Sequence, residues 1–178
     1  MPQTPRTKFT STVKLTDSEP PWHILHVPRE KVADFGFKGN LRRVVCTLAE
    51  SETFHCALFP SRGDYFITLS KALRKRLGLE ADMQVAVELV PDTSKYGMPM
   101  PNELSEVLRQ DADGKDLFEK LSPGDQRLFL KLIAFVKDED RRITRSLVGI
   151  ELLKKSGGKF DYHMQHDAMR IASAIAWK

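Results

Sequence analysis

The densest group of charged side chains that could do chemistry lies in one short segment, formed by Lys71, Arg74, Lys75 and Arg76. Lysine and arginine neutralise phosphates, so a helix lined by them predicts binding of nucleic acid or another anion. The same pattern is typical of a solvated helix face beside an apolar stripe, which Leu73 and Leu77 would form four residues apart. The residues by themselves leave both interpretations open.

Histidines that could hold a metal ion occur as two pairs. His163 and His166 lie three residues apart beside Asp161, a spacing that fits one face of a helix. Two histidines without a third firm ligand are a weak pattern, so we predict no metal site there. His23 and His26 are also three residues apart, but in a strand they would face opposite ways and could not bind one ion together.

Residues for covalent catalysis are not arranged as known nucleophiles require. The sequence has no serine elbow and no cysteine–histidine spacing of that kind. Cys46 and Cys56 fall in predicted strands, where we expect small core residues. The segment 61–64 is too short to cradle a phosphate and favours a hairpin turn. The sequence therefore favours a protein without a cofactor that is not an enzyme; an enzyme with an unrecognised site is an alternative.

Aromatic residues are interleaved with the predicted strands of the first half. Side chains of this kind can line a small ligand cleft in the mouth of a barrel, although they more often fill its interior. We name three of them as candidate cleft residues: Trp22, Phe59 and Tyr65.

The elements that must position these residues are mostly strands up to Val90. Alternating or β-rich segments separated by turn residues predict strands at 22–27, 41–48, 54–59, 65–69 and 83–90, the second and third of them forming a hairpin. Pro28 ends the first strand and starts a short helix that Gly36 closes. The chain up to Thr12 is polar, so we expect a flexible start or the lead into a first strand.

The segment from Tyr65 to Leu89 is a strand, a short helix, a glycine turn and a second strand. Ser70 is a good N-cap, and Gly78 tolerates the positive φ that ends a helix. A shift of 42 positions overlies Val27-Pro28 on Leu69-Ser70. This looser copy predicts two related units closing one barrel. In the upstream helix basic and acidic residues nearly cancel, so the pair does not predict a symmetric DNA-facing surface.

After the Pro-rich segment 91–101 the sequence turns helical. We predict helices at 102–109, 116–121, from Ser122-Pro123 onward, at 139–155 and at 167–177. The predicted fold class is α+β: a small, partly open β-barrel in residues 1–92, a linker at 93–101 and a helical C-terminal subdomain at 102–178.

The helix and turn after Ser70 resemble the swapped-hairpin module of AbrB-type transcription regulators. In that module a Pro-Lys pair leads the helix and a Gly-Asp turn follows it, where this chain has Ser70-Lys71 and Ala81-Asp82. The resemblance implies DNA binding as one alternative function.

A longer stretch, from Lys8 to Leu108, resembles the barrel domain of unknown function that accompanies YdeI/OmpD-associated (bacteriocin-protection) proteins. Its marks are Trp22, Val27-Pro28, the 43–48 strand, Leu58-Phe59-Pro60, Gly63-Asp64-Tyr65, Leu69-Ser70-Lys71 and Val85–Asp92. The segment 121–143 is similar to the helical tail of that family, with Leu132 or a neighbour in place of its tryptophan. The resemblance implies a bacterial binding or interaction protein linked to stress or bacteriocin protection, with no established reaction.

Bulk composition sets outer limits on function. With 41% hydrophobic and 29% charged residues, the chain is typical of a soluble globular protein. The net charge of +4 permits an anionic partner without arguing for one. No apolar run is long enough to span a membrane, and the start lacks the apolar core of a secretion signal, so we expect a cytoplasmic protein. The expected partner is a protein or small ligand; nucleic acid is permitted but not favoured.

Overall fold

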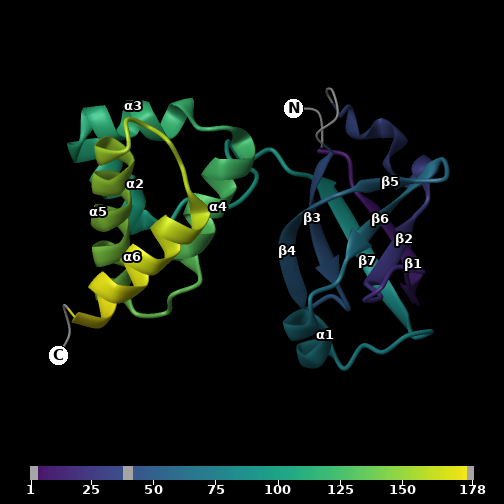
Figure 1. The fold of residues 1–178 in the computed structure, drawn as a ribbon. Coiled ribbons are helices and arrows are strands. Elements are labelled where there is room, and N and C mark those ends of the chain that lie inside the picture. Colours follow the sequence, from purple (N-terminus) through teal and green to yellow (C-terminus); the bar gives the residue numbers. More distant parts are fainter. Residues whose placement is uncertain (1–3, 38–41, 176–178) are drawn as a thin grey trace. The chain divides into compact units, whose positions relative to one another are not determined.

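The computed structural model of the chain describes residues 4–37 and 42–175 and divides into two compact units, Met1–Thr93 and Ser94–Lys178 (Figure 1). No helix among the described residues is long and apolar enough to cross a membrane. The architecture is α+β, as predicted: a curled antiparallel sheet of seven strands is followed by helices.

The strands of the first unit form one sheet in the order β4-β3-β7-β1-β2-β6-β5. The sheet curls as a partly open barrel (Figure 1). Its apolar faces turn inward around a core that includes Leu25, Leu48, Ile67 and Leu89. The strands are β1 (Thr7–Leu15), β2 (His23–Val27), β3 (Arg43–Leu48), β4 (Glu52–Ala57), β5 (Phe59–Ser61), β6 (Asp64–Thr68) and β7 (Gln84–Pro91).

Of the two expectations for the polar N-terminal segment, a flexible start or the lead into a first strand, the second is confirmed, and the strand lies at the centre of the sheet. β1 pairs with β7 on one side and β2 on the other, both antiparallel. Its threonines are β-branched and suit a pleated surface even where they are polar. Val13 is fully buried, and Ser11 Oγ donates a hydrogen bond to the His26 carbonyl oxygen at 2.8 Å. Periodicity alone missed this strand because its buried face contains few large apolar side chains.

The two strand–helix–turn–strand units pair with each other strand by strand. β2 pairs with β6, and β3 pairs with β7, both antiparallel. The 3-10 helix η1 (Arg29–Phe35) connects β2 to β3, and the helix α1 (Lys71–Leu77) lies between β6 and β7. The two helices end on Gly36 and Gly78, whose φ values are 60° and 64°. Ser70 Oγ accepts a hydrogen bond from the Leu73 N–H, the cap that the sequence predicts. Leu41, the first residue of the strand predicted at 41–48, lies outside the described residues.

The second unit is a helical bundle with its own core, which includes Phe118, Phe129, Ile133, Ile150 and Met169. Its helices are α2 (Asn102–Gln110), α3 (Ala112–Lys120), α4 (Pro123–Ala134), α5 (Glu139–Lys155) and α6 (Tyr162–Ile175).

Two helices of this bundle begin earlier than the sequence pattern indicates. Asp111 Oδ1 accepts a hydrogen bond from the Gly114 N–H, so α3 starts at Ala112 rather than Asp116. Asp161 Oδ1 likewise accepts a hydrogen bond from the Met164 N–H, so α6 starts at Tyr162 rather than at the predicted residue 167. In both cases an aspartate N-cap sets the boundary. Trp177, at the end of the last predicted helix, lies outside the described residues.

Candidate functional site: a groove between α2 and α5

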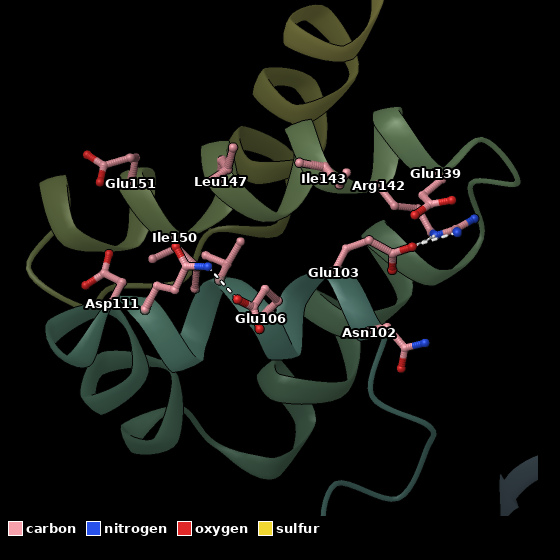
Figure 2. Close-up of a pocket in the computed structure, with 12 residues that line it drawn as sticks. Asn102, Glu103, Glu106, Asp111, Glu139, Arg142, Ile143, Leu147, Ile150 and Glu151 are labelled. Carbon is pink, nitrogen blue, oxygen red and sulfur yellow. Dashed lines mark hydrogen bonds and ion pairs between the residues drawn. The ribbon is translucent and has the colours of Figure 1, made fainter.

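Helices α2 and α5 lie side by side and run in the same direction. Glu103 near the start of α2 accepts hydrogen bonds from Arg142 near the start of α5, with Nη2 and Oε1 2.6 Å apart. At the other end of α2, the Lys154 Nζ lies 3.0 Å from Asp111 Oδ2. Figure 2 shows the first of these pairs as a dashed line. The two ion pairs fix the spacing of the helices and so the width of the groove between them.

The groove has a volume of about 740 Å³ and an apolar middle. On α5, Glu139, Ile143, Leu147 and Glu151 follow one another at four-residue steps, which places them on one stripe of the helix (Figure 2). Ile143 and Leu147 are 40% and 51% exposed, whereas Ile150 beneath them is buried. The stripe is therefore apolar at its centre and acidic at both ends.

Carboxylates outnumber basic side chains around the groove, and four of them pair with Arg109, Arg142 or Lys154. Five carboxylates and one guanidinium border it: Glu103, Glu106, Asp111, Glu139, Glu151 and Arg142. Hydrogen bonds from Arg109 and, to a smaller extent, from Gln110 lower the pKa of Glu106 to about 2. Arg142 lowers the pKa of Glu103, and the Gly114 N–H together with Lys154 lowers that of Asp111. All three carboxylates are thus ionised at neutral pH.

Hydrogen bonds and ion pairs hold three carboxylates of the groove in the charged form. The lowered pKa values of Glu103, Glu106 and Asp111 make these groups poor proton acceptors at neutral pH. Among residues 4–37 and 42–175 no group of three or more His, Cys, Asp or Glu side chains could hold a metal ion. In the first unit, a hydrogen bond with Cys56 and burial raise the pKa of Cys46, so this thiol stays protonated and unreactive.

The predicted basic cluster lies on α1, away from the groove elements in the sequence. Arg76 pairs with Glu52 on β4 through two contacts, Nε–Oε1 at 3.0 Å and Nη2–Oε2 at 3.1 Å. Lys71 and Lys75 are exposed, and Arg74 is half-buried. Three of the four bases stand in the last turn of α1, where positive charge also stabilises the helix dipole.

The three predicted cleft residues differ in exposure and in the side chains that they contact. Trp22 is 58% exposed, and Phe59 is 45% exposed and stacks on Phe66 with ring centres 5.4 Å apart. Tyr65 is buried, and the Arg42 guanidinium lies 5.3 Å from the centre of its ring. Tyr65 alone borders a small hollow of the first unit.

The histidines mostly pair with carboxylates. His26 Nε2 lies 2.8 Å from Asp64 Oδ2, and His55 Nδ1 lies 2.9 Å from the buried Asp92 carboxylate. His163 and His166 both contact the ring of Tyr162 at the start of α6.

The groove itself was missed at the level of sequence. Ile143 and Leu147 have a helical spacing that, in a sequence alone, is typical of the buried face of the helix predicted at 139–155. The sequence does contain a signal for the groove. Glu139 and Glu151 continue the four-residue spacing of Ile143 and Leu147 on either side. Acids at both ends of an apolar stripe are unusual for a buried helix face, because charged side chains are rarely buried.

Two family models match the chain. Residues 9–89 match a domain of unknown function, DUF1905, and residues 98–155 match the family described as Bacteriocin-protection, YdeI or OmpD-Associated. The second match contains α2 and α5, and therefore the groove. Among curated proteins, none matches the chain. The predicted resemblance is confirmed: a barrel domain of unknown function precedes a helical tail of the YdeI type.

Proposed function

We propose that this chain, a DUF1905 domain followed by a segment of the YdeI/OmpD-associated family, is a non-enzymatic binding protein whose α2–α5 groove takes a cationic amphipathic helix. The observation that carries the proposal is the stripe on α5, with two exposed apolar side chains between two carboxylates. The chain as a whole has a net charge of +4, so this concentration of negative charge is local to the groove.

The shape of the stripe supports a helical occupant. Glu139 and Glu151 are twelve residues apart on one helix, which corresponds to about 18 Å at 1.5 Å per residue. A partner helix of about three turns would cover Ile143 and Leu147 with its apolar face. Lysine or arginine at its two ends would then meet the acidic ends of the groove, which sets both affinity and register.

Because the matched family is described as Bacteriocin-protection, YdeI or OmpD-Associated, we propose that the bound helix belongs to a protein or peptide partner in bacteriocin protection. A cytoplasmic location and a small-ligand partner remain predictions from the sequence.

A synthetic peptide tests the proposal directly. Its sequence would form about three helical turns, with leucines on one face and lysines at both ends. We expect fluorescence anisotropy to give a dissociation constant on the order of 10 μM at low salt. The double variant Glu139→Gln/Glu151→Gln should weaken binding by about five- to tenfold, because each end loses a charge pair. Leu147→Glu should abolish it.

Two controls make the result specific. Glu30→Gln removes an exposed acid from η1 in the first unit and should leave peptide affinity unchanged. A peptide with the same leucines and glutamates in place of the lysines should not bind. Equal binding of both peptides, or unchanged affinity in the double variant, would rule out the groove as a site for cations.

The alternative function, duplex DNA binding through α1, is tested with the same protein. The exposed Lys71 and Lys75 are the side chains that would contact phosphate. A gel shift that weakens steeply with salt and is lost in Lys71→Ala/Lys75→Ala would support it; no shift at low salt would reject it.

A further inference from the structure

The two edges of the sheet in the first unit are built differently. β5, at one edge, has three residues, and its central Pro60 has no N–H to donate. β4, at the other edge, has six residues and contains neither proline nor lysine (Figure 1). Short length, proline and lysine are features by which edge strands avoid pairing with another chain. β5 therefore has this protection and β4 lacks it.

The backbone groups of β4 point alternately to β3 and to the free edge. The Leu58 N–H donates a hydrogen bond to the Arg42 carbonyl oxygen at 2.8 Å, in register with the β3–β4 ladder. The next carbonyl oxygen, that of Arg43, accepts instead from the Asp92 N–H on the other side of β3. Because bonded and non-bonded pairs alternate in an antiparallel ladder, the even-numbered residues of β4 bond to β3. The odd-numbered residues direct their N–H and C=O groups to the free edge: Thr53, His55 and Ala57.

This row of backbone groups is available for a further strand. In the part of the chain that the structure describes, β4 pairs with β3 alone. No other backbone hydrogen bond joins the residues of β4 to a described segment.

The apolar side chains of β4 lie at the rim of the barrel core. Phe54 lies opposite Cys46, and Cys56 lies opposite Val44. Since Cys46 and Val44 are fully buried, Phe54 and Cys56 face the same core. They are only partly buried themselves, because no strand follows β4 in the sheet. A strand added at this edge would cover them.

We propose that this edge binds a second copy of the chain, with the two β4 strands antiparallel about a twofold axis at His55. His55 then exchanges both backbone hydrogen bonds with His55 of the second copy, and Thr53 does so with Ala57 of the second copy. The partial charges of the edge are complementary to themselves in this arrangement, because every N–H meets a C=O. Phe54 of each copy lies opposite Cys56 of the other in a close, non-hydrogen-bonded pair.

The charged groups near β4 are compatible with this pairing. Glu52 lies outside the paired segment 53–57, and its carboxylate is held by Arg76 Nε at 3.0 Å. The two His55 rings would be neighbours on the outer face, and each has the Asp92 carboxylate of its own copy 2.9 Å from Nδ1. The segment 53–57 itself contains no lysine, arginine, aspartate or glutamate. The interface uses no residue of the α2–α5 groove, so it goes beyond the proposed function and does not depend on it.

Sedimentation velocity and an isotope-filtered NOE experiment on the full chain test the proposal. Over a range from about 10 μM to about 0.5 mM, we expect association with a dissociation constant on the order of 100 μM, because the paired segment is short. In a mixture of isotope-labelled and unlabelled copies, an NOE should join Phe54 Hα to Cys56 Hα of the second copy, since the Cα atoms of such a pair lie about 4.5 Å apart. A chain that stays monomeric at the highest concentration, or a dimer without this NOE, would overturn the proposal.

The variant Ala57→Pro separates association from folding. The Ala57 N–H is not bonded to β3, so proline leaves that ladder intact and the melting temperature should change little. Association should weaken about tenfold, because one hydrogen bond is lost on each side of the axis. Ala57→Ser is the matched control, since it keeps the N–H, and it should leave the dissociation constant unchanged. Equal association of the two variants would show that the copies do not meet through β4.

Discussion

The two units of this protein differ in how their architecture buries apolar side chains. In the barrel unit, the sheet curls so that its large aliphatic residues face one another, and Leu25, Ile67 and Leu89 are fully buried. In the helical unit, α5 buries Ile150 and Leu153 but leaves Ile143 and Leu147 exposed in the groove. A curled sheet covers its own inner face, whereas a helix has a full circumference and needs neighbours on every apolar side. In the proposed function, the exposed Ile143 and Leu147 are the apolar contacts for the partner helix.

The largest expected effect contrasts a core leucine with a groove leucine. Leu25→Ala should lower the free energy of unfolding by about 2–5 kcal/mol, because it leaves a cavity at the centre of the sheet. Leu147→Ala should change it by less than about 0.5 kcal/mol, because the side chain is half exposed, while it weakens peptide binding. Denaturant unfolding measures both. Similar losses in the two variants would show that Leu147 is a core residue and not a docking residue.

A smaller loss of stability is expected from a substitution in the core of the helical unit, on the side of α5 that does not line the groove. Gly149 on α5 faces Phe129 and Met169, and a Cβ there would lie 2.7 Å from Phe129 Cζ and closer still to Met169 Cε. Gly149→Ala should therefore lower the free energy of unfolding by about 1–3 kcal/mol.

The matched control for this variant is Gly124→Ala in the first turn of α4. Its nearest neighbour would be Ser122 Oγ at 3.6 Å, an ordinary contact. Alanine in a helix reduces the freedom of the unfolded chain, so a gain of up to about 1 kcal/mol is expected. If Gly149→Ala were equally harmless by thermal unfolding, the approach of α5 to α6 would be looser than the structure shows.

The smallest expected effect concerns the pH dependence of the groove. The pKa values of Glu103, Glu106 and Asp111 are all lowered, so these carboxylates stay charged well into the acidic range. Affinity for the cationic peptide should change by less than about twofold between pH 8 and pH 5 and fall at lower pH. Anisotropy titrations across this range measure it. A midpoint near neutrality would mean that a histidine, rather than these acids, controls binding.

The same lowered pKa values have a consequence for stability. A carboxylate whose pKa is lower in the folded state stabilises that state at pH values above its unfolded pKa, about 4.3 for glutamate. This contribution is lost as the pH falls toward the folded pKa. The Glu103–Arg142 pair should therefore hold α2 to α5 at neutral pH and release it in acid.

Several elements were predictable because their signals are local. Ser70 and Gly78 define α1 through the geometry of a cap and a positive φ, and Ser122-Pro123 does the same for α4. The β3–β4 hairpin follows from two β-rich segments around a polar turn. The strand β1 was not predicted as a central strand, because its role depends on pairing with β7, more than seventy residues away.

The sequence alone determined the fold class, the family resemblance and most element positions, since caps, turns and hydrophobic periods act over a few residues. Only the tertiary structure decided which apolar stripe is left uncovered and which charges gather. Glu103 and Arg142 meet across 39 positions of sequence, and Arg29 and Arg62 border one hollow from separate elements. Such neighbours are fixed by packing and strand pairing between distant segments, which no local pattern records.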